Sequence, residues 1–175
     1  MAFRADGTFD FAGLKLRFKM RWPEKLWGVL GLALNQELSM TRRDYEANEL
    51  GWEVRPVIDF EWKRLYLADN PIVAVPLGGV TSGVPELEPS FKGAVRAVDF
   101  FSVGAEYYAA FGPINRAVAV VDQSHRLFGA LDFEWKYGRQ LYDLNFAVGY
   151  GFTGPEKWIA KLIFEVDFEP LVPAP

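Results

Sequence analysis

Large apolar residues alternate with small or charged residues along most of this chain, and this period of two constrains the fold more than any other feature. The alternation is clearest in residues 141–168. There Tyr142, Leu144 and Phe146 are separated by Asp143 and Asn145. A strand sends successive side chains to opposite faces of its sheet, so such stretches predict strands with one apolar and one polar face.

Nine strands are predicted in this way, at residues 13–22, 26–40, 51–62, 65–77, 87–97, 100–111, 125–135, 141–152 and 158–168. The first, third, fifth and seventh strands are followed by tight turns, whereas long loops at 41–50, 78–86 and 112–124 follow the second, fourth and sixth. Outer-membrane barrels alternate short and long connections in the same way. Pro56 lies within the third strand and is expected to cause a bulge or a weakened pairing, because proline cannot donate to a ladder.

The predicted fold is all-β, an antiparallel up-and-down transmembrane β-barrel over residues 13–168. An N-terminal segment, 1–12, precedes the barrel, and a C-terminal extension, 169–175, follows it. Nine strands is an odd number, whereas single-chain bacterial barrels have an even number. The N-terminus also lacks the pattern of a secretory signal. We therefore expect that at least one N-terminal strand is missing, or that closure is imperfect.

Composition excludes several other classes of protein. The net charge of −4 gives no electrostatic basis for binding nucleic acid. The chain has no cysteine and a single histidine, so neither a disulfide scaffold nor a metal site is expected, and no cofactor is predicted. No apolar run approaches the roughly 18 residues of a membrane helix.

Alternation alone also fits a soluble or periplasmic barrel that binds an apolar ligand inside. Three features favour a bacterial outer membrane and its lipid instead. The polar faces of the late strands carry many small residues, the charges on these faces are of mixed sign, and tryptophans lie at strand ends, as in an interfacial girdle. The outward-facing girdle residues are predicted to be Trp22, Trp52, Trp62, Trp135 and Trp158.

The polar faces supply the candidates for a lumen lining. They are Lys15, Arg17, Lys19, Arg21, Glu53, Arg55, Asp59, Glu61, Glu106, Arg126, Asp132, Glu134, Asp143, Asn145, Lys161 and Glu165. The basic stripe of the first strand, Lys15 to Arg21, could attract anions. We favour cross-strand ion pairs instead, with the charged residues of strand 51–62 as partners.

Ser124 and His125 are the one place to consider an enzyme, because nucleophilic catalysis needs serine and histidine within hydrogen-bond reach. Adjacent residues of a strand point to opposite faces, so this pair is a poor dyad, and we expect no enzyme. The predicted function is passive transport of small-molecule solutes through a narrow, charged lumen. A non-conducting structural barrel and the soluble apolar-ligand barrel are the alternatives.

Five segments, in order, carry a resemblance to a known family: GWEVRPVIDFEW, LYLADNP, GAEYYAAFGPI, DQSHRLF and LYDLNFAVGYGFT. They resemble the C-terminal portion of the meta-pathway phenol-degradation family of bacterial outer-membrane barrels. The resemblance implies a barrel of about a dozen strands that passes small molecules. Phe168 is similar to the terminal aromatic residue recognised by barrel-insertion machinery, but EPLVPAP follows it here.

Overall fold

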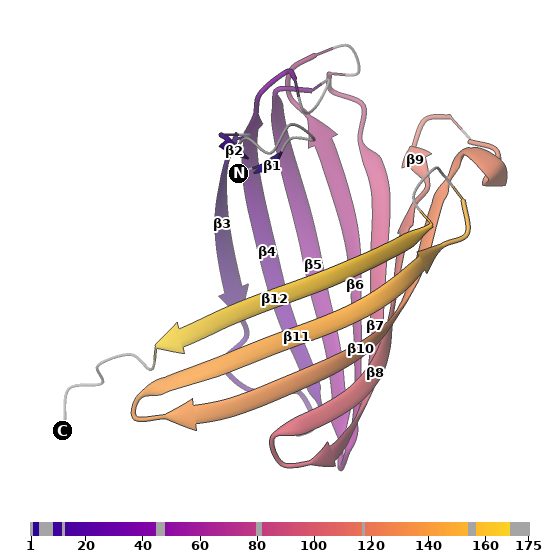
Figure 1. Ribbon diagram of the computed structural model, residues 1–175. Helices are drawn as coiled ribbons and strands as arrows, with labels where there is room; N and C mark the ends of the chain where they lie inside the picture. Colours follow the sequence, from indigo (N-terminus) through magenta and orange to yellow (C-terminus); the bar gives the residue numbers. More distant parts are fainter. Residues whose placement is uncertain are drawn as a thin grey trace.

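The computed structural model describes residues 2–3, 9–11, 13–44, 48–79, 82–116, 118–153 and 157–168. In this part of the chain, nine long strands form one antiparallel sheet that curls into an open half-barrel (Figure 1). Neighbours in sequence are neighbours in the sheet, in the order β12-β11-β10-β8-β7-β6-β5-β4-β3. No helix in the described residues is long and apolar enough to cross a membrane.

The strands of the main sheet are β3 (Gly13–Arg21), β4 (Leu30–Thr41), β5 (Leu50–Trp62), β6 (Leu65–Pro76), β7 (Glu86–Val98), β8 (Phe101–Ala110), β10 (Ser124–Tyr137), β11 (Gln140–Gly151) and β12 (Trp158–Phe168). Two short strands, β1 (Ala2–Phe3) and β2 (Phe9–Asp10), pair with each other. The short strand β9 (Gly112–Pro113) pairs with the start of β7, and a 3-10 turn, η1 (Val120–Asp122), follows it. The predicted C-terminal extension, 169–175, lies outside the described residues, as does most of segment 1–12.

The nine predicted strands are confirmed, with boundaries that shift by a few residues. The largest shift is in the second strand, predicted from residue 26 and observed from Leu30. Leu26 and Leu30 exchange two backbone hydrogen bonds around a turn in which Trp27 has a φ of 51°. The first connection is therefore longer than the tight turn predicted. The connections β5–β6, β7–β8 and β10–β11 are tight, as expected. Together with the β3–β4 connection they lie at one end of the sheet, which we call the turn end, and the opposite end is the loop end.

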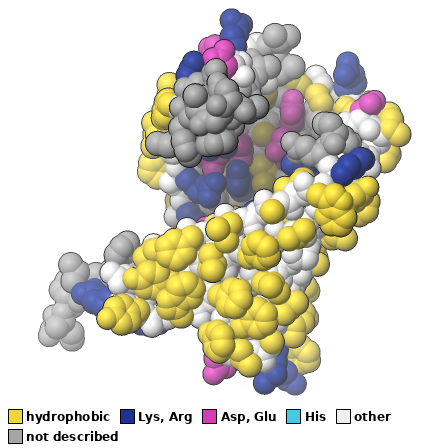
Figure 2. Space-filling model, viewed as in Figure 1, with side chains coloured by type: hydrophobic (Ala, Val, Ile, Leu, Met, Phe, Trp, Pro, Cys, Tyr) yellow, Lys and Arg dark blue, Asp and Glu magenta, His cyan; other side chains and the backbone are white. Residues whose placement is uncertain are grey.

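Apart from a register shift between Arg96 and Val98 at the end of β7, the strand pairing assigns alternate side chains consistently to two faces of the sheet. The outer face is formed by Leu16, Phe18 and the other even-numbered residues of β3, and by the residues aligned with them across the sheet. The inner face is formed by Lys15, Arg17 and the residues aligned with those. Figure 2 shows hydrophobic side chains gathered over the outer face of β10–β12, and charged side chains in the recess behind it. The predicted apolar and polar faces are thus outer and inner faces.

Pro56 weakens pairing as predicted, but without a bulge. The β5–β6 register is the same on both sides of it, and the ladder lapses only between Val54–Val73 and Ile58–Asp69. The constant register places Pro56 level with Pro71, which pairs in turn with Pro89 of β7. Three prolines therefore lie side by side across β5, β6 and β7, where each lacks an amide donor.

The sheet is open in the structure. β3 and β12 form its two edges, and no pairing between them occurs among the described residues. In Figure 1, β12 swings across the front of the curled sheet, from the loop end of β7 and β10 toward the side of β3. The all-β antiparallel architecture is therefore observed, whereas the closed barrel predicted from sequence stays a prediction.

The tightest packing lies on the inner face of β8, β10 and β11. Phe128 is 4% exposed and contacts Ala130, Ala147 and the ring of Tyr108, whose centroid lies 5.5 Å away in an edge-to-face arrangement. A Cβ placed on Gly149 would lie 2.4 Å from the Phe128 ring, so only glycine lets this ring lie flat on β11. Small residues on the inner face thus make room for a few large ones.

Replacing Gly149 with alanine should destabilise the sheet by about 1–3 kcal/mol, the usual range for overpacking a close contact. Gly129 is the matched control, because a Cβ there meets nothing within 4 Å, and its alanine variant should change stability by less than about 0.5 kcal/mol. Urea unfolding followed by tryptophan fluorescence would measure both. Equal losses for the two variants would contradict this account of the packing.

Candidate functional site

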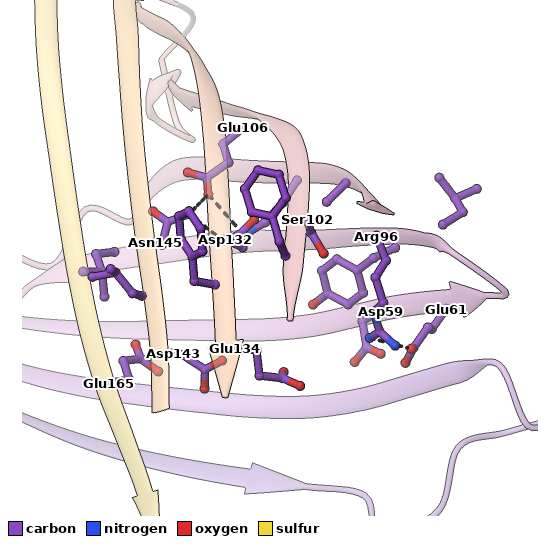
Figure 3. Close-up of a pocket in the computed structure, with 18 of the residues that line it drawn as sticks. Asp59, Glu61, Arg96, Ser102, Glu106, Asp132, Glu134, Asp143, Asn145 and Glu165 are labelled. Carbon is purple, nitrogen blue, oxygen red and sulfur yellow. Dashed lines mark hydrogen bonds and ion pairs between the residues drawn. The ribbon is translucent and has the colours of Figure 1, made fainter. Parts of the chain in front are cut away.

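The inner face encloses a hollow with a volume of about 610 Å³, open to solvent and lined by residues of all nine long strands (Figure 3). Eight Lys or Arg side chains and eight Asp or Glu side chains line it. The lining is therefore balanced in formal charge, unlike a site built for ions of one sign. How these charges are arranged decides what the hollow can do.

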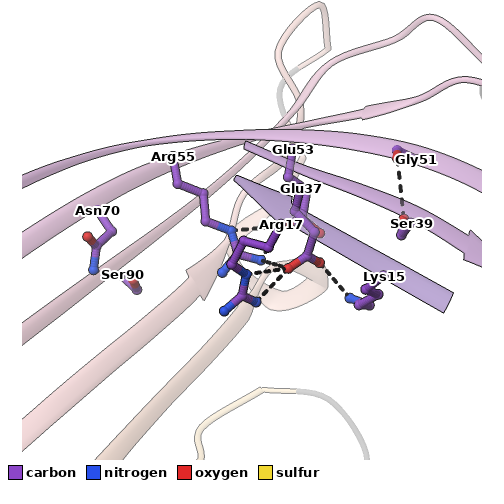
Figure 4. Close-up of polar contacts among 9 residues, drawn as sticks. All are labelled: Lys15, Arg17, Glu37, Ser39, Gly51, Glu53, Arg55, Asn70 and Ser90. Carbon is purple, nitrogen blue, oxygen red and sulfur yellow. Dashed lines mark hydrogen bonds and ion pairs between the residues drawn. The ribbon is translucent and has the colours of Figure 1, made fainter. Parts of the chain in front are cut away.

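Glu37 of β4 is the centre of one cluster of charges (Figure 4). It is 1% exposed, and both of its carboxylate oxygens accept hydrogen bonds. Lys15 donates to Oε1 at 2.9 Å, and Arg17 donates from Nε to Oε2 at 2.9 Å. Arg55 of β5 lies 3.7 Å from Oε2 and also bonds to Glu53. A carboxylate buried to this extent requires such partners, because an unpaired charge away from water is very unfavourable.

Glu106 of β8 is the centre of a second cluster and is 3% exposed. Its partners are Lys161 of β12, Lys92 of β7 at 3.4 Å, the hydroxyl of Tyr108 at 2.8 Å and the amide of Asn145 at 3.0 Å. Two strands separate β8 from β12, a distance of about 14 Å in a flat sheet. The Lys161–Glu106 bond therefore spans the inside of the curl and stabilises it.

Lys92 connects this second cluster to Asp132 of β10, whose Oδ1 accepts a hydrogen bond from Lys92 at 2.6 Å and another from Asn145 at 2.7 Å. Oδ2 of Asp132 and Oδ1 of Asn145 are buried without a hydrogen-bond partner in the described structure. Buried acceptors of this kind are usually satisfied by water. The centre of the hollow is accordingly polar and suited to hydration.

Three carboxylates lie in one row near the turn end, on the inner face of the last strands. Glu134 is aligned with Asp143, and Asp143 with Glu165 (Figure 3). Like charges directly opposite each other in a sheet repel. No ion pair is observed for these three residues, or for Lys19 and Arg21 on the opposite wall, within the described chain. A second group at this end, Lys25, Glu61 and Arg96, is paired.

All sixteen predicted lumen residues lie on the inner face, as their parity predicts. Most line the hollow, but five do not: Lys15, Arg17, Glu53, Arg55 and Arg126. The charged residues of strand 51–62 were predicted to pair with the basic stripe, and this prediction was only partly right. Of strand β5 only Arg55 and Glu53 join the cluster, and the central carboxylate is Glu37, which lies on the strand between.

Glu37, Lys92 and Tyr108 are the important residues that sequence reasoning missed. A signal existed for Glu37, because it is the lone carboxylate on the inward parity of β4 and is aligned with Arg17 in the first hairpin. The sequence shows that Lys92 and Tyr108 point inward. It does not show the curl that brings β12 close to them.

The five predicted girdle tryptophans all lie on the outer face and are exposed. Near the turn end, the rings of Trp135 and Tyr142 stack with centroids 5.5 Å apart. Near the loop end, Tyr150 packs against Trp158 at 5.3 Å. Each end of the last strands therefore has an aromatic cluster, consistent with the predicted girdle.

His125 has partners other than Ser124. Its Nδ1 lies 2.7 Å from the hydroxyl of Tyr107, and its Nε2 lies 3.1 Å from Oε1 of Gln123. The backbone N–H of His125 donates to Thr153 at 3.0 Å. The histidine is thus part of a hydrogen-bonded group at the loop end of the outer face, and the geometry offers no dyad with Ser124.

Among the described residues, no group of three or more His, Cys, Asp or Glu is arranged to hold a metal ion. Comparison of the chain with protein-family models, curated proteins and solved structures gives no match. The resemblance to the meta-pathway phenol-degradation family therefore stays a prediction.

Replacing Glu37 with glutamine should lower the free energy of unfolding by about 1–3 kcal/mol, because Lys15 and Arg17 lose the charge they bind. Glu49 is the matched control, since its bridge to Arg43 is exposed and 3.8 Å long, and its glutamine variant should cost less than about 1 kcal/mol. Denaturant unfolding would measure both. If the two losses are equal, Glu37 is not the centre of its cluster.

Proposed function

We propose that this chain forms a β-barrel of a bacterial outer membrane and allows small molecules to diffuse through its charged interior. One observation carries the proposal. On the outer face of the nine described strands, Asp69 is the single charged residue, whereas the inner face carries most of the strands' charges. An outward apolar face needs an apolar solvent, and lipid supplies it.

The height of the apolar surface supports this proposal. Trp52 and Trp62 stand ten residues apart near the two ends of β5, a separation of about 33 Å along the strand. At the tilt of about 40° that membrane strands adopt, this corresponds to roughly 25 Å across the membrane, the height of the apolar band in such barrels. Tyr142 and Tyr150 on β11 place the aromatic clusters of the last strands about 20 Å apart on the same basis.

The alternative of a soluble barrel with an apolar interior requires the opposite arrangement. It places Leu16 and Phe18 inside, whereas Phe18 is 73% exposed and Leu16 is exposed as well. The hollow is lined by charges rather than by the apolar surface such a ligand needs. These observations favour the membrane alternative.

Passage of small polar molecules is the activity that the hollow supports best. Its volume suits a small solute, and its equal numbers of cations and carboxylates favour neutral or zwitterionic solutes over ions of one sign. The bond between Lys161 and Glu106 crosses the interior, which is also the observation that favours a non-conducting structural barrel. Conductance measurements distinguish the two.

Leu162 and Ile163 give a direct test of the membrane, because they are neighbours on opposite faces of β12. Leu162 is 70% exposed on the outer face, midway between Trp158 and Val166, and Ile163 lines the hollow. Leu162→Arg should destabilise a membrane barrel by about 2–4 kcal/mol, whereas Ile163→Arg should change stability by less than about 1 kcal/mol.

The measurement is urea unfolding from lipid vesicles, together with gel mobility before and after boiling in detergent. In a water-soluble protein, arginine at the exposed position 162 would be harmless. A stable, monodisperse Leu162→Arg variant in detergent-free buffer would therefore overturn the membrane proposal.

Single-channel recording tests transport. Glu134 lines the hollow and has no ion-pair partner among the described residues, so Glu134→Lys should shift the cation-to-anion permeability ratio toward anions. A two-unit charge change beside a wet path alters an ion's energy by on the order of 1 kcal/mol, which is roughly fivefold. Glu49→Lys, outside the hollow, is the control and should leave the ratio unchanged. An absence of conductance in the unmodified chain would favour the structural barrel.

A further inference from the structure

The two edges of the open sheet, β3 and β12, run in the same direction. Eight consecutive antiparallel pairings separate them, so each reversal of direction is undone by the next. If these edges meet, the resulting pair is parallel and not antiparallel.

An open edge is incompatible with the membrane proposal, on which this inference rests. In the hydrocarbon layer, each unpaired backbone N–H or C=O costs several kcal/mol, so membrane-spanning sheets close. Large apolar side chains of the outer face are also highly exposed at both edges, among them Phe18 and Met20 on β3 and Leu162 and Phe164 on β12. Both properties call for a neighbouring strand at each edge.

The inner faces of the two edges are complementary in charge over their C-terminal halves. On β3, Lys15 and Arg17 are neutralised by Glu37, whereas Lys19 and Arg21 have no ion-pair partner in the described chain. On β12, Lys161 is bound to Glu106, whereas Glu165 and Asp167 have no such partner there. A parallel arrangement brings the free cations and the free carboxylates to the same end of the barrel.

The two edges already face one space. Lys19 and Arg21 from β3 line the same hollow as Ile163 and Glu165 from β12. Figure 1 shows β12 returning across the sheet so that its C-terminal end lies on the side of β3. Pairing of two β3 strands from different molecules would bring two basic stripes together, and like charges directly opposite are destabilising.

We propose that the barrel closes within one chain by parallel pairing of β3 with β12, with Lys19 and Arg21 beside Glu165 and Asp167 on the inner side of the seam. On the outer side, the same pairing places Phe18 and Met20 against Phe164 and Val166 and completes the apolar surface. The seam thus gives Lys19 and Arg21 carboxylate partners, one of which, Glu165, is the member of the acidic row that lies on β12.

Disulfide cross-linking tests the seam in a chain that has no cysteine of its own. Met20→Cys would be combined in turn with Leu162→Cys, Phe164→Cys and Val166→Cys in the chain folded in detergent micelles. Neighbours in a parallel pair lie about 4.8 Å apart, within the range that a disulfide spans. On addition of a mild oxidant that accepts the two electrons, at least one combination should therefore form an intramolecular disulfide, visible as a change in gel mobility that a reductant reverses and that involves no dimer.

Two controls fix the direction of pairing. Met20→Cys with Leu34→Cys joins residues aligned in the observed β3–β4 register and must cross-link. Leu14→Cys lies about 20 Å from position 20 along the same strand. With Phe164→Cys or Val166→Cys it should cross-link on the order of tenfold less than the best Met20 combination, because disulfide geometry tolerates little displacement.

The outcomes separate the seam from the membrane proposal. Cross-links between two molecules only, cross-links with Leu14→Cys in preference to Met20→Cys, or none beyond the positive control would overturn the seam. Insertion into vesicles would be measured separately, by quenching of tryptophan fluorescence with brominated lipid. If the chain inserts but the seam cross-link does not form, the proposed function stands and the seam is wrong. If the cross-link forms but the chain does not insert, the seam stands and the membrane proposal is wrong.

Charge exchange tests the electrostatic part of the seam. Arg21→Glu places an acidic group beside Glu165 and Asp167 and should reduce the yield of the Met20 cross-link severalfold. Adding Glu165→Lys to the same chain should restore it. If Arg21→Glu and Glu165→Lys each reduce the cross-link yield and their combination does not restore it, these two residues are not in contact.

Discussion

Buried carboxylates that bind cations from several strands are the interaction on which the rest of this structure depends. Glu37 binds Lys15 and Arg17 of the first strand, and Glu106 binds Lys161 of the last. Because burying an unpaired charge is unfavourable, Glu37 reinforces the pairing of β4 with its neighbours β3 and β5, and Glu106 joins β8 to β12, two strands beyond its ladder neighbour. The Lys161–Glu106 ion pair therefore stabilises the curl of the last strands from within, where the apolar core is small.

This arrangement inverts the usual relation between core and surface. The inner face holds the charges, and only a small apolar group around Phe128 is tightly packed. The outer face holds the leucines, phenylalanines and tryptophans, most of them exposed. In water such a surface would promote association, whereas in lipid it is the favourable surface. The balance of charge inside and the near absence of charge on the described outer strands are two aspects of the same partition.

The strands and their faces could be predicted from sequence because a period of two is a local property. Parity alone places Leu144 and Asn145 on opposite faces, and the register confirms it. The partners of the charges could not be predicted in the same way. Glu37 takes the cations of β3 because β4 lies between β3 and β5, and Lys161 reaches Glu106 because the sheet curls. Both facts are tertiary, as is the gap between the two edges.

The row of Pro56, Pro71 and Pro89 has a consequence for how firmly the middle strands are held together. Three adjacent strands lack an amide hydrogen at one level, and the β5–β6 ladder lapses there. At this level fewer backbone hydrogen bonds hold the neighbouring strands together. The row crosses β5, β6 and β7 at one level, so it weakens the middle wall of the curl locally, whereas the ladders that join β3 to β4 and β8 through β12 are continuous.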